Sequence, residues 1–365
     1  MLSFFRKWFA RHFSDPQAVG LAIVLVAGFL LVYAAGQMLA PVIASVILAY
    51  LLDGAVSAFE RRKVPRLLAV AAVFSLFMAA LIFFIFGLLP LLSRQATQLA
   101  NRLPEMLAHG QDLLLQLPER YPGLLTVDQI QEVISTVRLE IVGLGQQAVT
   151  LSLSSLVGLI TVLLYLILMP LMVFFFLKDK SRIVDWVKSF LPEERELVGE
   201  VWRDVDLQIA NYVRGKFIEI MIVGVVSYVT FLFLDLQFAV LLGVLNGLSV
   251  LVPYIGATVV TFPIAAVAYF QFGPSTDFVW LMSAYLVIQA LDGNVLVPLL
   301  FSEVVNLHPI AIIVAILVFG GLWGFWGVFF AIPLATLVQA VLKAWPTFDD
   351  KELRPPVNEE PDQAA

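Results

Sequence analysis

The sequence predicts an all-α fold, a polytopic transmembrane bundle of about eight spans, and two observations carry that prediction. Of the 365 residues, 61% are hydrophobic and 14% are charged, whereas soluble domains contain about half and about a quarter. The apolar runs are long and uncharged, and they lack the period-2 alternation of barrel strands. This composition excludes a soluble globular enzyme, and a net charge of −6 argues against a nucleic-acid partner.

The N-terminal part is expected to contain a surface helix followed by membrane helices. Residues 1–17 predict a basic amphipathic helix at the membrane interface, because phenylalanines at helical spacing alternate with Arg6, Lys7 and Arg11. Residues 18–93 predict transmembrane helices, with 19–52 forming a hairpin broken near Gly36 and Pro41. A cleaved signal peptide is the alternative, but the apolar run continues past Pro41 to Leu52.

The remaining segments follow from the distribution of charge. Residues 94–149 predict a small helical segment outside the cytoplasm, since 94–140 holds only four of the 22 basic residues and the positive-inside rule applies. Residues 150–177 predict a membrane helix, 178–216 a charged cytoplasmic helical segment, and 346–365 a disordered acidic tail. Both termini are therefore expected in the cytoplasm.

The C-terminal transmembrane block, 217–345, is the part that indicates function. Its residues 217–342 contain no Lys or Arg. Two apolar stretches are interrupted by glycine and proline and carry Asn or Asp: one holds Asn246, Pro253 and Gly256, the other Asp292-Gly293-Asn294 and Pro298. Paired interruptions of this kind predict broken or re-entrant helices around a transport site.

Asp292 is the central candidate, because an acid at membrane depth costs several kcal/mol unless it is paired or hydrated. It must be protonated, hydrated, bound to a cation, or matched to a base outside the block, such as Arg214 or Lys216. The alternative is a helix-capping role near an interface. Glu219 lies close enough in sequence to pair with Arg214, and Asn246 and Asn294 are also typical of hydrogen bonds between membrane helices. The candidate substrate- or ion-binding residues are Asp292, Asn294, Asn246, Gln289, Glu219 and Arg214, and the candidate hinge residues are Pro253, Gly256, Pro298 and Gly293.

Enzymatic chemistry is not predicted. The chain has no P-loop, no cysteine and no catalytic or metal-ligand motif, so no cofactor and no metal site are expected. The glycine-rich stretch 320–327 predicts either close packing between helices or a tight turn between two segments.

With these residues in view, the chain resembles the autoinducer-2 exporter family of bacterial inner-membrane permeases. The resemblance rests on Gln208-x3-Tyr212-x-Arg214-Gly215, on 252–256, on Asp292-x-Asn294-x3-Pro298, and on the glycine and proline pattern of 307–333. It implies export of small solutes, and it implies a homo-oligomer, namely a pentamer.

Three functions remain open from the sequence. The first is a secondary transporter that exports a small solute, such as an autoinducer-2-like signal or another metabolite, coupled to H⁺ or Na⁺ through Asp292. The second is a Na⁺(Li⁺)/H⁺ antiporter of the same family. The third is a non-transporting membrane scaffold or regulator that uses 178–216 for docking. Substrate, direction and coupling stay undetermined.

Overall fold

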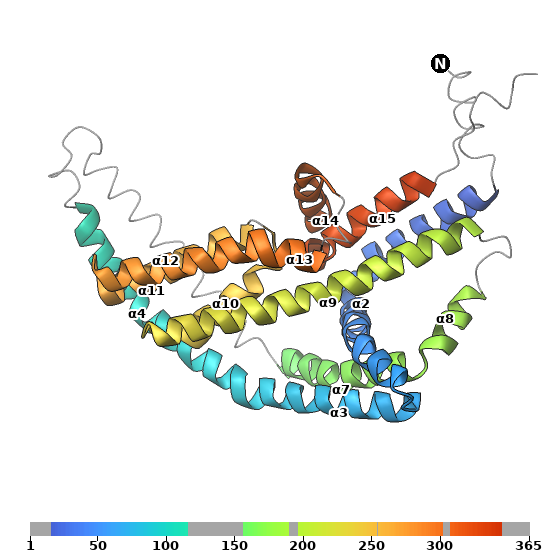
Figure 1. Ribbon diagram of the computed structural model, residues 1–365, viewed down its shortest axis with the longest axis horizontal. Coiled ribbons are helices and arrows are strands. Elements are labelled where there is room, and N and C mark those ends of the chain that lie inside the picture. Colours follow the sequence, from blue (N-terminus) through green and yellow to red (C-terminus); the bar gives the residue numbers. More distant parts are fainter. Residues whose placement is uncertain (1–15, 116–155, 190–195, 254, 302–306, 345–365) are drawn as a thin grey trace, which may run out of the picture. The chain divides into compact units, whose positions relative to one another are not determined.

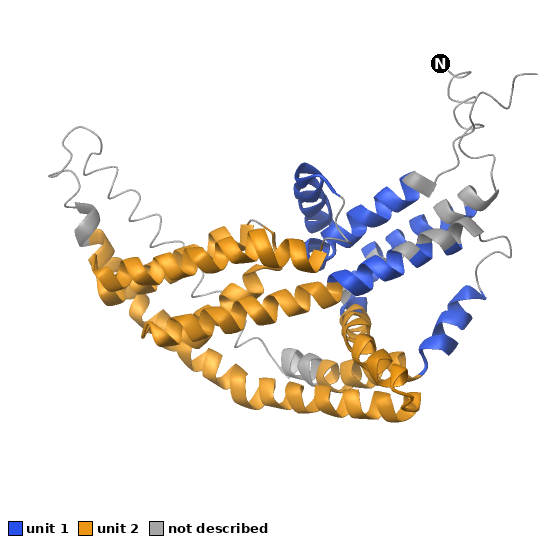
Figure 2. Ribbon diagram, viewed as in Figure 1, with its two compact units in different colours: residues 1–40, 179–212, 303–365 blue, residues 41–178, 213–302 orange. Residues whose placement is uncertain are grey.

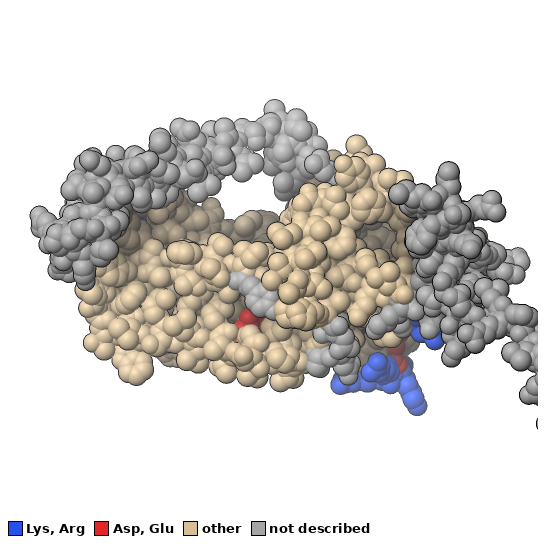
Figure 3. Space-filling model, turned by 90° about the horizontal axis from the view of Figure 1, so that it is seen from above, with Lys and Arg blue, Asp and Glu red and all other residues tan. Residues whose placement is uncertain are grey.

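The computed structural model describes residues 16–115, 156–189, 196–253, 255–301 and 307–344, and every regular element in these ranges is a helix (Figure 1). Six stretches are long and apolar enough to cross a membrane: Met38–Arg61, Arg66–Gln111, Val205–Phe233, Ile255–Phe272, Thr276–Phe301 and Pro309–Phe329. Shorter apolar helices accompany them. On the face shown in Figure 3, the described side chains are almost all uncharged, as lipid contact requires. The predicted all-α polytopic membrane fold is confirmed.

The chain forms two compact units (Figure 2). One contains residues 1–40, 179–212 and 303–365, and the other contains 41–178 and 213–302. The long helices α2, Pro16–Arg61, and α9, Glu196–Phe233, contribute residues to both units. All candidate site residues belong to the second unit.

Helix α2 corrects one expectation. The predicted hairpin break near Gly36 and Pro41 is absent, and α2 runs through both positions as one helix of 46 residues. Proline inside a membrane helix is tolerated where neighbouring groups satisfy the backbone. One turn later the Ser45 hydroxyl donates to the Pro41 carbonyl at 2.6 Å and lies 3.2 Å from the Met169 carbonyl of α7, Leu156–Lys178. The carbonyl that Pro41 leaves without a backbone donor is that of Gln37.

The first half of the second unit packs α2 against α3, Arg66–Phe83, and α7 through a small apolar core around Val56, Val70 and Val173. Arg66 closes this group at its polar end. Its guanidinium donates to the Leu177 carbonyl at 2.7 Å and to Glu60 at 3.2 Å. Beyond α3 the helix continues as a π-helical turn, η1, Phe84–Leu88, and then as α4, Leu89–Leu115.

The second half contains α9, α10 (Ala239–Ser249), α11 (Ile255–Phe272), α12 (Thr276–Leu291), the π-helical turn η2 (Asp292–Leu296) and α13 (Val297–Phe301). Its core surrounds Phe231, Leu242, Ile264 and Leu281. Helices α9 and α10 approach at glycines: a Cβ atom on Gly247 would lie 2.7 Å from the Ile220 carbonyl oxygen. At about 1.5 Å per residue, the eleven residues of α10 reach only about half-way across a bilayer.

The first unit packs α15, Ala331–Ala344, against Val205 of α9 and Leu25 of α2. Helix α14, Pro309–Phe329, turns sharply at Gly324, whose φ of 59° is left-handed. A Cβ atom on Gly327 would lie 1.8 Å from the Phe319 carbonyl oxygen, so the chain folds back tightly there. Of the two predictions for 320–327, the tight turn between two segments fits this geometry.

Several expectations lie wholly or partly outside the described residues. They are the interfacial helix at 1–17, most of the outer segment after Leu115, and the acidic tail 346–365. Within 178–216 the described part is helical, with α8, Lys180–Lys188, and the first turns of α9, and the candidate span Val205–Phe233 begins inside this segment.

Candidate functional site

A buried ion pair lies in the middle of α9. Glu219 is 14 residues from each end of the candidate span Val205–Phe233, and its Oε2 lies 2.8 Å from Lys216 Nζ. The two side chains are only 2% and 5% exposed. Spacing of three residues puts them on the same helix face. A pair buried this deeply is costly to desolvate, so it requires further polar contacts.

Lys216 has those contacts. Its Nζ donates a hydrogen bond of 2.7 Å to the carbonyl of Val250, directly after α10, and lies 5.4 Å from the ring centre of Phe301 in α13. The C-terminal end of a helix carries a partial negative charge, which suits an ammonium group. Lys216 therefore connects α9 to the end of α10 and to α13.

Asp292 interacts electrostatically with both members of this ion pair. Lys216 attracts its carboxylate, and Glu219 is repelled by it. Asp292 is half-buried, and its Oδ1 is buried without a hydrogen-bond partner among the described residues. The site thus holds two acids and one base, so it has an excess of one negative charge when both carboxyl groups are ionised.

The candidate pairing of Glu219 with Arg214 is wrong, because Glu219 forms its ion pair with Lys216. Residues five apart on a helix lie on different faces, whereas residues three apart are neighbours. The Arg214 side chain instead lies against Gly54 of α2, where its Cδ is 3.2 Å from the position of a Cβ atom. Its buried Nε has no hydrogen-bond partner in the described chain.

The second predicted interruption is a wide turn rather than a break. The Val297 N–H bonds to the Asp292 carbonyl, five residues back, and Pro298 follows without ending the helix. Gly293 has open space around it, so close packing does not require glycine there. Asn294 is exposed and donates to the Ala290 carbonyl of its own helix, away from the ion pair.

The first predicted interruption is a true break. Helix α10 ends at Ser249 and α11 begins at Ile255, with Pro253 between them. A Cβ atom on Gly256 would lie 1.7 Å from the Ser249 carbonyl oxygen, so only glycine fits the close return of the chain.

A partly buried chain of hydrogen bonds connects α9, α10, α11 and α12. The Asn246 amide donates to Ser227 of α9 at 2.7 Å and accepts from Gln289 of α12 at 2.8 Å. Gln289 also donates to Tyr285 at 3.0 Å, and the Tyr285 hydroxyl lies 2.8 Å from that of Thr261 in α11. The structure therefore brings together two predicted residues, Asn246 and Gln289.

An apolar layer separates the ion site from this amide network. Val223, Val250 and Ile288 form one buried cluster. On α9, Val223 lies one turn from Glu219 and one turn from Ser227, and on α12 Ile288 lies one turn before Asp292. One helical turn is about 5.4 Å, so the two polar groups are close but not joined.

Four members of these two groups were not candidates from sequence. Lys216 was named only as one possible partner, and Ser227, Tyr285 and Thr261 were not singled out. The signal for Lys216 was its three-residue spacing from Glu219. The hydroxyl residues gave no usable signal, because Ser, Thr and Tyr are ordinary residues of membrane helices.

Apolar spans, a half-length helix and buried charges at membrane depth define a multi-pass membrane protein of the transporter class. The comparison with known proteins identifies the family. Residues 21–347 match the model described as AI-2E family transporter, so the chain belongs to that family.

Individual relatives agree with this assignment. The chain is 46% identical to "Putative permease PerM" of Escherichia coli (strain K12) over 346 residues, which is 95% of this chain and 98% of the relative. It is 27% identical to "Putative transport protein YueF" of Bacillus subtilis (strain 168), covering 82% of each chain. It is 24% identical to "AI-2 transport protein TqsA" of Escherichia coli (strain K12), covering 89% of this chain and 92% of that one.

Proposed function

We propose that this protein is a secondary transporter that exports a small solute in exchange for one monovalent cation, H⁺ or Na⁺, bound at Asp292. The observation that carries the proposal is the charge balance of the buried site. Lys216 neutralises one of the two carboxylates, Glu219 and Asp292, and one negative charge remains at membrane depth. A single proton or Na⁺ restores neutrality, as burial in a low-dielectric region demands.

The geometry supports Asp292, rather than Glu219, as the exchangeable position. Glu219 is 2% exposed and is held by Lys216. Asp292 is half-buried, with one oxygen that has no partner among the described residues. An ion can therefore reach Asp292 and leave it more readily than it can enter the closed pair.

We expect the neutral polar side chains of the amide network to contact the transported solute. Asn246 and Gln289 occupy the two interrupted segments and already bond to one another. In this conformation the apolar layer of Val223, Val250 and Ile288 keeps that network apart from the ion site. Exchange requires a rearrangement that opens this layer on one side at a time.

The test uses proteoliposomes that contain the full chain and a pH-sensitive dye. Na⁺ or Li⁺ gradients, and then a panel of small metabolites, are imposed and proton movement is recorded. We expect Asp292→Asn to abolish coupled proton movement, because the variant lacks the negative charge that binds the ion. Na⁺-driven movement in the wild type would assign the antiporter form, and solute-driven movement would assign coupled export.

The matched control is Asp277→Asn, which makes the same change on an exposed first-turn residue of the same helix. It should leave the flux unchanged. Size-exclusion elution and thermal unfolding check that both variants fold. Flux that persists in a folded Asp292→Asn variant refutes the coupling role.

The location and assembly of the protein are part of the same proposal. We expect it in the bacterial inner membrane with both termini in the cytoplasm, as the distribution of basic residues predicts. The family resemblance predicts a homo-oligomer, a pentamer. Light scattering of the protein in nanodiscs and protease protection of tagged termini test these two points.

A further inference from the structure

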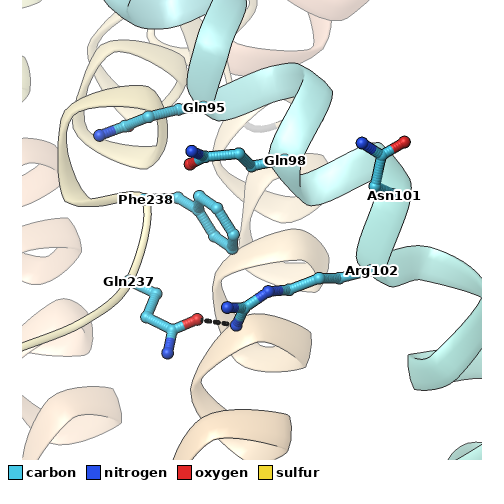
Figure 4. Close-up of a pocket in the computed structure, with 6 residues that line it drawn as sticks. All are labelled: Gln95, Gln98, Asn101, Arg102, Gln237 and Phe238. Carbon is cyan, nitrogen blue, oxygen red and sulfur yellow. Dashed lines mark hydrogen bonds between the residues drawn. The ribbon is translucent and has the colours of Figure 1, made fainter.

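A polar pocket lies between α4 and the loop before α10, away from the ion site (Figure 4). It is an open depression of about 440 Å³ at the surface of the described chain, and four of its six lining residues are exposed: Gln98, Asn101, Arg102 and Gln237. Among the residues that the structure describes, its lining contains one cation, one aromatic ring, four amides and no carboxylate: Arg102, Phe238, Gln95, Gln98, Asn101 and Gln237. Gln95, Gln98 and Arg102 share one face of α4, at spacings of three and four residues.

The backbone around the pocket is held in an uncommon conformation. Phe238 and Asp235 have left-handed φ angles of 60° and 54°, and only one further non-glycine residue in the described chain has a positive φ. Such conformations persist where the surroundings enforce them, and they concentrate at functional sites. Here Gln271 of α11 holds the loop, because it accepts from the Gln237 N–H at 2.7 Å and donates to the Asp235 carbonyl at 2.6 Å.

Arg102 is positioned by two neighbours. It donates to the Gln237 side-chain oxygen, and its guanidinium carbon lies 5.8 Å from the ring centre of Phe238. Gln95, on the same face of α4 as Arg102, accepts from the Leu241 N–H of α10 at 2.8 Å and so connects the two helices. These contacts use few of the five guanidinium donors of Arg102, and Figure 4 shows Gln237 beside that group, with the Phe238 ring between it and Gln98.

We propose that this pocket binds a small organic monocarboxylate, with its carboxylate on Arg102 and its apolar part against Phe238. A guanidinium presents a planar pair of donors that matches a carboxylate, and the Gln237 side chain lies next to it (Figure 4). One cation with no acid in the lining balances one negative charge. A phosphate monoester carries about −1.5 to −2 charges at neutral pH and would leave a charge uncompensated.

The inference rests on the proposed function only in treating the bound carboxylate as a transported solute. Binding itself needs neither ion coupling nor flux, so the two proposals can fail separately. If Asp292 couples transport but no carboxylate binds at Arg102, only the inference about the pocket is refuted. If a carboxylate binds at Arg102 but no coupled flux is seen, the inference about the pocket stands and the proposed transport mechanism is refuted.

The experiment uses the full chain in nanodiscs, with benzoate as the probe and benzamide as its neutral counterpart. Saturation-transfer NMR titrations give the affinity of each probe. We expect benzoate to bind the wild type, and Arg102→Gln to weaken binding by at least about tenfold, which is the effect of losing a charge-assisted contact. Arg94→Gln, two turns earlier on α4 and outside the pocket lining, should bind benzoate like the wild type.

Partitioning of the probes into lipid affects all variants equally, so the comparison between variants isolates the pocket. Equal benzoate affinity in the wild type and a folded Arg102→Gln variant overturns the proposal. Benzamide binding as tight as benzoate overturns it as well, because the charge would then have no role. Retention of benzoate binding in Arg102→Lys at a reduced level supports the paired geometry of the guanidinium.

Discussion

The strongest stability prediction concerns Lys216, whose removal leaves two acids without their cation. In Lys216→Met the side-chain volume is similar, but Glu219 keeps a 2% exposed carboxylate with no counter-charge, and the Val250 carbonyl loses its donor. Removing one partner of a buried ion pair destabilises a protein by about 3–5 kcal/mol. We expect an effect in this range on the free energy of unfolding.

The pairwise part of that cost is measured with a double variant. Lys216→Met combined with Glu219→Gln removes both charges of the pair, so about 2 kcal/mol of the loss should be recovered. Recovery is incomplete, because Asp292 also loses the attraction of Lys216. The assay is reversible unfolding in mixed micelles with increasing denaturing detergent, monitored by circular dichroism.

The control is an exposed pair of similar chemistry. Arg182 lies 3.9 Å from Asp179 and is 87% exposed, and surface pairs contribute at most about 1 kcal/mol. Arg182→Met should therefore change stability little. If Lys216→Met destabilises no more than Arg182→Met, or if the double variant is no more stable than Lys216→Met alone, the buried charge triad is not an energetic unit.

Two further comparisons test packing and the amide network with the same assay. Gly247→Ala should destabilise the protein by about 1–3 kcal/mol, because its Cβ would lie 2.7 Å from the Ile220 carbonyl oxygen. Gly293→Ala should be neutral or slightly stabilising, because no atom lies within 4 Å of the added Cβ. Equal losses of stability in the two variants would contradict the close contact between α9 and α10. Asn246→Ala should cost about 1–3 kcal/mol, because it removes two hydrogen bonds and leaves the buried Ser227 hydroxyl without its donor, while Gln289 keeps its bond to Tyr285. Asn294→Ala should stay within about 0.5 kcal/mol, since this exposed side chain bonds only within its own helix.

The membrane helices could be predicted from the sequence because the bilayer imposes one strong requirement. Each span needs about 20 apolar residues with satisfied backbone groups, and the uncharged runs meet it. The breaking of α2 at Pro41 was predicted from rules for an isolated helix. The prediction was wrong, since α2 continues through Gly36 and Pro41 as one helix and proline is tolerated inside membrane helices.

The candidate site could be predicted in part. Asp292, Asn246, Gln289 and Glu219 were identified because polar side chains stand out among apolar residues, and the structure places them in two adjacent groups. Their partners were harder to predict, since the bond between Asn246 and Gln289 spans 43 residues of sequence. The pocket beside Arg102 gave no sequence signal, because amides on an amphipathic helix are also typical of a solvated surface.

The two π-helical turns, η1 and η2, can both be explained by a nearby proline. Each begins six residues before a proline: η1 at Phe84, before Pro90, and η2 at Asp292, before Pro298. Proline removes a hydrogen bond and crowds the carbonyl four residues earlier, and a wider turn relieves both effects. Because η1, with the sequence FIFGL, has no polar side chain, the turn alone does not indicate a site. What distinguishes η2 is the acid at its first position, Asp292, whose carboxylate is attracted electrostatically by Lys216. The proposed ion binding therefore depends on the charge of Asp292, and we expect a replacement of Pro298 to alter the helix without removing that binding.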